Sequence, residues 1–147
     1  HRVMKRLLSI LVILTGCVIA VSAFARDDYN PRLITEPIKK FIKAKYDNAR
    51  IVEAEYDDGL LKVEIVHKRK EKNVYFSKDE WQYSEWDIRA TELPRAVTEA
   101  IAKTEYSAYR IDDVNYIQKS SGDYYKVELE RRDFDVVLLI TPQGVIL

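Results

Sequence analysis

The sequence predicts an α+β protein of two tandem units, each a helix followed by four strands, in an antiparallel curved sheet with the helices packed on one face. Three observations carry this prediction: residues that recur about sixty positions apart, a helical pattern at the start of each unit, and alternating strand patterns after it. The 147 residues include 24 Lys+Arg and 24 Asp+Glu, and 47% are hydrophobic. This composition is typical of a globular protein and excludes a nucleic-acid binder that acts through bulk positive charge.

The N-terminal segment, residues 1–25, has the three parts of a secretory signal peptide. Met4-Lys5-Arg6 gives a basic start, the run from Leu7 to Val21 contains no charge, and Ala23-Phe24-Ala25 supplies small residues for cleavage. We therefore expect a processed chain that begins at Arg26, is periplasmic or secreted, and keeps no transmembrane anchor.

Two alternatives stay open for this segment. The uncharged stretch is close to the roughly 20 residues that a membrane span needs. In addition, Leu14-Thr15-Gly16-Cys17 resembles a lipobox, in which Cys17 would become the lipidated first residue. A chain cut there would begin with the apolar string Val18-Ile19-Ala20-Val21 instead of a polar tether, which favours the cleaved signal peptide. Because Cys17 is the one cysteine of the sequence, no disulfide is expected.

An internal repeat organises the rest of the chain. Tyr46, Arg50, Ile51 and Tyr56 recur sixty positions later as Tyr106, Arg110, Ile111 and Tyr116. Lys62-Val63-Glu64-Ile65 recurs sixty-four positions later as Lys126-Val127-Glu128-Leu129, which indicates an insertion of four residues around Gln118 to Gly122. We expect the first unit in residues 26–88 and the second in residues 89–147.

Each unit begins with an amphipathic helical pattern. Apolar residues recur at three- and four-residue spacing, at Ile34, Ile38, Phe41 and Ile42 in the first unit and at Leu93, Val97, Ala100 and Ile101 in the second. Thr35 and Thr91 are placed to cap the helices, and Pro37 and Pro94 fall in the first turn, where a missing N–H is harmless. One helix is therefore expected at the start of each unit.

After each helix the hydrophobic period drops to two, which is typical of strands with one solvated face. In the first unit, turn residues divide the chain into expected strands at about 49–57, 60–67, 73–77 and 81–86. Asp57-Asp58-Gly59 predicts a tight hairpin between the first two. The second unit is expected to repeat the pattern, with its fourth strand at Val145 to Leu147, which align with Trp81 and Tyr83.

Strand alternation divides the predicted sheet into a core face and an outer face. We expect burial of Ile38, Phe41, Ile42, Val63, Ile65, Val74 and Phe76, and of the matching Val97, Ile101, Val127, Leu129, Leu138 and Ile140. The outer face then receives Lys62, Glu64, Tyr75, Lys126, Glu128, Val137 and Leu139, joined by Tyr124 and, if its strand continues that far, Trp86.

This outer face is the candidate binding site. Its apolar members are Tyr75, Trp86, Tyr124, Val137 and Leu139, and charged Lys and Glu residues surround them. Protein interfaces have such a composition, with aromatic anchors inside a charged surround. The same residues could instead only brace the sheet through cross-strand pairs, and this alternative stays open.

The chain offers little catalytic chemistry. After residue 25 it has one histidine, His67, and no cysteine, so a nucleophilic triad or a multi-histidine metal site cannot be assembled readily. We expect His67 to be a solvated residue at the end of a hairpin, and the charged run Lys68-Arg69-Lys70-Glu71-Lys72 to be a solvated hairpin end. The sequence therefore predicts no catalytic residues, no metal site and no cofactor.

Several motifs resemble one known family. They are Trp86-Asp87-Ile88, Leu93-Pro94-x-Ala96-Val97, Ile111-Asp112-Asp113-Val114 and, above all, Gly122-Asp123-Tyr124-Tyr125-Lys126-Val127-Glu128-Leu129. They resemble the β-lactamase-inhibitor-like, PepSY-like family of secreted bacterial proteins. The resemblance implies a periplasmic, non-enzymatic module of tandem helix-plus-four-strand repeats that form a curved sheet.

The chain departs from the family pattern at two turns. The family often has an Asp-x-Asp-Gly type turn between its last two strands, where this chain has Ser77-Lys78-Asp79-Glu80 and Thr141-Pro142-Gln143-Gly144. The substitution argues against a cation-binding turn. No residues match the inhibitory loops of β-lactamase inhibitors, so inhibition of that enzyme class is not carried over.

Two functions follow as expectations. The first is a binding or inhibitory module for an envelope protein or peptide, with no nucleic-acid partner because the protein is exported. The second is a carrier that holds a small apolar ligand between sheet and helices. The large aliphatic residues predicted for the core would fill that space, which disfavours the carrier.

Overall fold

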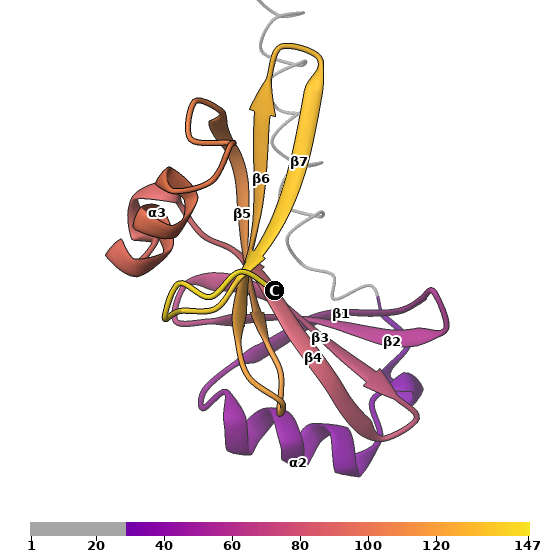
Figure 1. The fold of residues 1–147 in the computed structure, drawn as a ribbon. Helices are drawn as coiled ribbons and strands as arrows, with labels where there is room; N and C mark the ends of the chain where they lie inside the picture. The colour runs from indigo at the N-terminus through magenta and orange to yellow at the C-terminus, as the bar shows by residue number, and fades with distance from the viewer. Residues whose placement is uncertain (1–28) are drawn as a thin grey trace, which may run out of the picture.

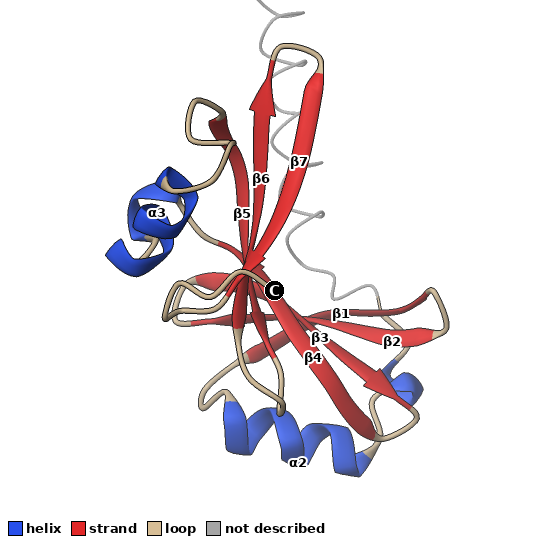
Figure 2. Ribbon diagram, in the orientation of Figure 1, coloured by secondary structure: helices blue, strands red, loops and turns tan. Residues whose placement is uncertain are grey.

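The computed structural model describes residues 29–147, which form one antiparallel sheet with two α-helices (Figures 1 and 2). The sheet has seven strands in the order β1 to β7, so each strand pairs with the next one along the chain. The α+β class and the antiparallel sheet predicted from the sequence are confirmed. The expected signal peptide, with Cys17, lies outside the described residues.

The elements of the first half are η1 (Pro31–Leu33), α2 (Glu36–Lys45), β1 (Arg50–Asp57), β2 (Leu60–His67), β3 (Lys70–Ser77) and β4 (Glu80–Asp87). Those of the second half are η2 (Ala90–Glu92), α3 (Arg95–Ala102), β5 (Arg110–Gln118), β6 (Tyr124–Arg131) and β7 (Phe134–Ile140). The first-unit strands lie where turn residues and alternation predicted them, although β3 begins earlier than expected, at Lys70.

The described residues do not form the predicted eighth strand. After β7 the chain turns through Thr141, and one isolated bridge joins Ile140 to Ile146. The turn is fitted against α3: Gly144 has φ +88°, and a Cβ at this position would lie 2.6 Å from the carbonyl oxygen of Ala96. This backbone contact, which only glycine permits, was not visible in the alternation pattern.

The capping prediction for the second helix is wrong. Thr91 lies within η2, where the Glu92 carboxylate accepts a hydrogen bond from the Arg89 N–H at 2.7 Å, and the N-cap of α3 is Pro94. In the first helix Thr35 is the N-cap residue, but its hydroxyl donates to Asp79 Oδ1 at 2.7 Å and not to a helix amide. Thr35 therefore occupies the predicted N-cap position, but its side chain does not cap the helix with a hydrogen bond.

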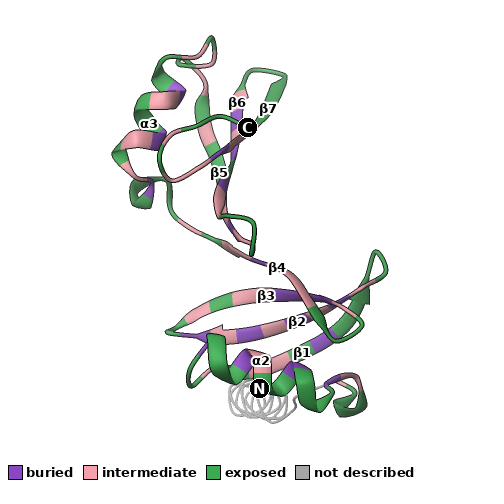
Figure 3. Ribbon diagram, turned by 60° about the horizontal axis from the view of Figure 1, so that its bottom comes forward, coloured by how far each residue is buried: buried purple, intermediate pink, exposed green. Residues whose placement is uncertain are grey.

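Each helix packs against its own half of the sheet (Figure 3). In the first half Ile38 and Ile42 of α2 join a cluster that includes Val63, Ile65, Val74 and Phe76. In the second half Val97 and Ile101 of α3 join Val127, Leu129 and Ile140. All predicted core residues are buried except Phe41 and Leu138, which are half-buried and pack against these clusters.

Bulges recur at matching points of the two halves. In β1, Ile51 pairs with Ile65 and Glu53 pairs with Glu64, so Val52 is an extra residue. In β5 the extra residue is Asp112, sixty positions further on. A bulge increases the local twist of a sheet.

The sheet is so strongly twisted that β5 to β7 rise from the side of β1 to β3 that faces away from α2 (Figure 1). β4 passes between the two halves (Figure 3). The two surfaces that lie opposite the helices, one in each half of the sheet, therefore meet at an angle.

The burial of Phe76 makes a direct test of this core possible. Phe76→Ala is expected to lower the free energy of unfolding by about 3 to 5 kcal/mol, because it leaves a cavity among fully buried side chains. Phe134→Ala is the matched control, since Phe134 is 69% exposed, and it should change stability by no more than about 0.5 kcal/mol. Urea unfolding followed by far-UV circular dichroism measures both, and equal effects would contradict the assignment of the core.

Candidate functional site

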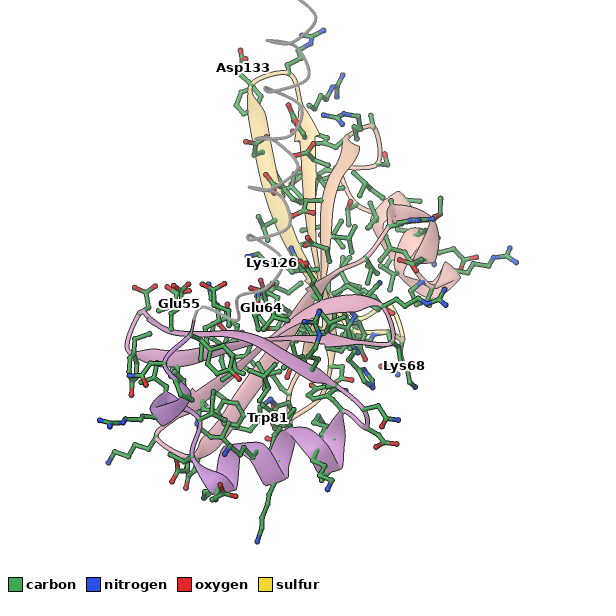
Figure 4. All side chains as sticks on the ribbon, turned by 180° about the vertical axis from the view of Figure 1, so that it is seen from behind. Glu55, Glu64, Lys68, Trp81, Lys126 and Asp133 are labelled. Carbon is green, nitrogen blue, oxygen red and sulfur yellow. The ribbon has the colours of Figure 1, made fainter. Side chains whose placement is uncertain are left out.

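The candidate site is the outer face of the sheet, the side opposite α2 and α3. On β2 the buried Val63 points toward α2, so its neighbours Lys62 and Glu64 point outward. On β3 the buried Val74 pairs with Val63, so the side chain of Tyr75 belongs to the outer face. Figure 4 shows Glu55 and Glu64 on this face of the first half, on the side where Lys126 of β6 lies.

Four of the five predicted site residues lie on the outer face. Tyr75 is only 8% exposed and stacks on Tyr83, with ring centroids 4.4 Å apart and 18° between the planes. Tyr124 is half-buried opposite Ile117, and Leu139 is half-buried opposite Lys126. Val137 is 50% exposed opposite Glu128. Tyr75 therefore forms part of the floor of the face, whereas Val137 protrudes from it.

The prediction for Trp86 is wrong, because its side chain lies on the helix side of the sheet. Its ring lies 4.8 Å from that of Tyr116, and the ammonium group of Lys72 lies 4.2 Å from its ring centroid. The cause is a bulge in β4: Phe76 pairs with Trp81 but Tyr75 pairs with Tyr83. The extra residue, Gln82, inverts the alternation for the rest of the strand.

The same bulge places Tyr83 on the outer face, which the sequence reasoning missed. Without the extra residue, Tyr83 would face the helices and could not stack on Tyr75. Ile117, paired with Tyr124 across β5 and β6, is a second missed member of this face and is buried. No local signal could have found Tyr83, since the bulge depends on pairing between two strands.

The outer face carries many acidic side chains on β1 to β5. Outward carboxylates come from Glu53, Glu55 and Asp57 on β1, Glu64 on β2, Glu71 on β3, Glu85 and Asp87 on β4, and Asp113 on β5. Basic residues at outward positions of these strands are Lys62 and, at the starts of β1 and β5, Arg50 and Arg110. A signal for this feature exists in the sequence, because Glu53, Glu55 and Asp57 alternate with Ala54 and Tyr56.

Like charges are held close together on this face. Glu64 pairs in register with Glu53, and its pKa is raised by burial first, then by a hydrogen bond to Glu53 and by the charge of Glu71. Lys62 Nζ lies 2.8 Å from Glu55 Oε1, and this bond is the main reason why the pKa of Lys62 is raised. A pocket of about 180 Å³ opens beside these groups, and its lining residues are Lys62, Glu64, Glu71, Asn73, Glu85, Trp86, Asp87 and Asn115. Trp86 lies in β4 between Glu85 and Asp87, so it borders this pocket although its ring packs on Tyr116.

The stacked tyrosines stay neutral. Burial, followed by the charges of Tyr83 and Glu85, raises the pKa of Tyr75 to about 12. Burial also raises the pKa of Tyr83, with Glu85 and Asp57 adding to the effect. The face therefore combines uncharged aromatic rings with carboxylates that surround them.

His67 is buried on the helix side, so the prediction of a solvated residue is wrong. Its ring lies 5.4 Å from that of Tyr46 in T-shaped contact, and its Nδ1 lies 3.0 Å from Lys72 Nζ. Burial, together with the charges of Lys72 and Lys68, lowers the pKa of His67, while Asp47 opposes the shift. A neutral ring can accept the ammonium proton of Lys72 at Nδ1, which gives His67 a structural role.

A buried polar network links α2 to β4 and β5. The Tyr46 hydroxyl lies 2.6 Å from Ser84 Oγ and donates to Gln118 Oε1 at 2.7 Å. Trp81 Nε1 donates to the same Ser84 oxygen at 3.0 Å. Ser84 is fully buried, and Tyr46 and Trp81 are its hydrogen-bond partners. Within residues 29–147, no group of three or more His, Cys, Asp or Glu is placed to hold a metal ion.

Comparison with known proteins adds a family and a fold. The family model described as "Putative beta-lactamase-inhibitor-like, PepSY-like" matches residues 27–77 and again residues 61–147. No curated protein matches the chain. None of the helices within residues 29–147 is long and apolar enough to cross a membrane.

Solved structures with the same fold come from Bacteroides species. A BLIP-like protein from Bacteroides fragilis is 23% identical with TM-score 0.69, and the match covers 77% of this chain and 82% of that one. A DUF2874 family protein from Bacteroides uniformis is 23% identical with TM-score 0.67, over 76% and 85% of the two chains. A protein from Bacteroides eggerthii described as "putative periplasmic" is 21% identical with TM-score 0.65, over 77% and 85%.

The buried His67 predicts a pH dependence of stability. Its pKa is lowered by folding from the ordinary value of 6.5, so the unfolded chain binds the proton more readily and stability falls as the pH drops below that value. Between about pH 8 and about pH 5.5, the Tm of the wild type should fall by several degrees more than that of His67→Gln, whose amide oxygen still accepts from Lys72. Thermal unfolding at the two pH values measures this difference, and parallel curves would refute it.

Proposed function

The chain belongs to the β-lactamase-inhibitor-like, PepSY-like family, and from this membership we propose that it is a non-catalytic binding module of the cell envelope. The module recognises a protein or peptide with the outer face of its sheet. The observation that carries this proposal is the composition of that face. Among residues 29–147 no helix covers Val137, Leu139 and Tyr124 on its second half, and its first half carries many carboxylates.

The shape of the sheet supports the same face as the recognition surface. Both helices already bury the opposite side, through Ile38 and Ile42 in one half and Val97 and Ile101 in the other. The outer face needs no apolar residues for that packing, yet Val137 is half exposed on it. The angle between the two halves would let a partner contact both of them at once (Figure 1).

An envelope location is supported by the N-terminal segment. Residues 1–25 have the pattern of a cleaved signal peptide, and the structurally similar Bacteroides eggerthii protein is described as "putative periplasmic". We propose a periplasmic or secreted protein that begins at Arg26, with lipidation at Cys17 as the alternative. The two repeats of residues 26–88 and 89–147 are part of the same proposal, supported by the double family match.

A carrier of small apolar ligands is the second candidate, and the core disfavours it. Val63, Val97 and Val127 have no exposed surface, so the space between helices and sheet is filled in both halves. A pocket of about 300 Å³ does lie beside the end of α2, with a mixed lining of Ile42, Tyr46, Ala49 and Ile51 and of Lys39, Lys43, Asp47 and Asn48. Because it lies at the surface beside charged side chains and not in the core, it would enclose an apolar molecule only in part.

The proposal is tested with variants of the protruding apolar residues. Val137→Lys combined with Leu139→Lys should lower the capture of envelope proteins by immobilised protein about fivefold or more, because a charge enters the apolar half of the face. Quantitative mass spectrometry of periplasmic extract measures capture, and thermal unfolding measures the stability of each variant.

The matched control replaces Tyr56 and Phe134 with Lys. Both residues are 69% exposed and belong to the helix side of the edge strands, so the control adds the same charge elsewhere. Capture that survives in the control and is lost in the face variant at similar Tm supports the proposal. Equal capture by both variants would leave the outer face with a structural role only.

A further inference from the structure

We propose that the outer face recognises a cationic, extended protein segment rich in Arg and Lys, which runs parallel to the strands over the acidic part of the face. This inference rests on the proposed function and names the chemistry of the partner. Acidic groups on this part of the face include Glu53, Glu64, Glu71 and Glu85, and they outnumber the basic Lys62, Arg50 and Arg110.

The outer face holds carboxylates close to one another on adjacent strands. Glu53 and Glu64 are directly opposite on adjacent strands, an arrangement that destabilises a sheet when both carry charge. The raised pKa of Glu64 reports the same repulsion, together with burial. Lys62, two positions before Glu64 in β2, bonds to Glu55, and its charge offsets the raised pKa of Glu64 only in part, so the group of Glu53, Glu64 and Glu71 keeps an excess of negative charge. A cation from a partner would relieve that repulsion.

The spacing of acidic side chains along a strand matches the spacing of side chains in an extended segment. Outward residues along one strand, such as Glu53 and Glu55, are about 6.7 Å apart, which is twice the rise per residue of a strand. An extended partner segment projects alternate side chains at the same interval. Successive Arg or Lys side chains of such a segment can therefore each meet a carboxylate.

The pocket on this face is lined mainly by acidic residues. Glu64, Glu71, Glu85 and Asp87 contribute to its wall, against one basic residue, Lys62. A guanidinium presents five N–H donors in a fixed fork, and carboxylates match that fork with two acceptors each. Its volume of about 180 Å³ suits the head of a single side chain and not a folded domain.

An aromatic floor lies beside the carboxylates. The ring of Tyr83 is half-buried and neutral, and a guanidinium can stack on such a ring, whereas Tyr75 is only 8% exposed and stacks on Tyr83. The chain itself already places a cation here, because Lys119 Nζ lies 5.9 Å from the centroid of the Tyr83 ring.

The experiment uses a labelled twelve-residue peptide of alternating Arg and Ser as the probe. Binding is followed by fluorescence anisotropy at low and at physiological salt, with Gln/Ser and Glu/Ser peptides for comparison. The face variant combines Glu64→Gln, Glu71→Gln and Glu85→Gln, which removes charge and preserves shape. The control variant combines Glu36→Gln, Glu99→Gln and Glu105→Gln, which removes the same charge from exposed positions of α2, α3 and the loop after α3.

The Arg/Ser peptide should bind the wild type, and the face variant should bind it about tenfold more weakly, while the control stays within about twofold. Neither comparison peptide should bind. Thermal unfolding must show that the face variant folds, and its Tm is expected to equal or exceed that of the wild type because repulsion is relieved.

Three results would overturn the inference: no saturable binding of the Arg/Ser peptide, an equal loss in both triple variants, or binding of the Gln/Ser peptide with the same affinity. Its failure is distinguishable from failure of the proposed function. If the peptide does not bind but capture of envelope proteins still depends on Val137 and Leu139, the outer face remains a recognition surface and only the cationic partner is refuted.

Discussion

The whole arrangement depends on β4, the last strand of the first half, which joins the two halves of the sheet. It pairs with β3 on one side and with β5 on the other, and its pairing with β5 makes the seven strands one sheet. The hydroxyl of Ser84, at its centre, is fully buried and is held by Tyr46 and Trp81. Because a buried hydroxyl without partners is costly, this network fixes the junction between α2 and the sheet.

The bulge in β4 has consequences on both faces. On the helix side it places Trp86 between Lys72 and Tyr116, which extends the buried surface from the first half toward the second. On the outer face it brings Tyr83 onto Tyr75. A single extra residue thus supplies both the packing at the junction and the aromatic floor of the candidate site.

The residues that stabilise the fold and the residues proposed for recognition lie on opposite faces of the sheet. The helix side holds the core residues, and the polar groups buried there, such as His67 and Ser84, have partners within the protein. The outer face instead keeps Glu53 beside Glu64 and leaves Val137 half exposed, and neither choice favours folding. Residues that do not serve the fold are where function is expected.

The sequence by itself determined the features that depend on local periodicity. Alternation and helical spacing identified the core positions from Ile38 to Ile140, and the same alternation placed Tyr75, Tyr124, Val137 and Leu139 opposite the helices. Only the tertiary structure decided the rest: Trp86 and Tyr83 depend on a bulge defined by pairing with β3, and His67 is buried because Tyr46 of α2 packs on it. The course of the chain after β7 depends on the contact of Gly144 with Ala96. The physical reason is common to all of them, since each depends on residues far apart in the chain, whereas periodicity reports only on neighbours.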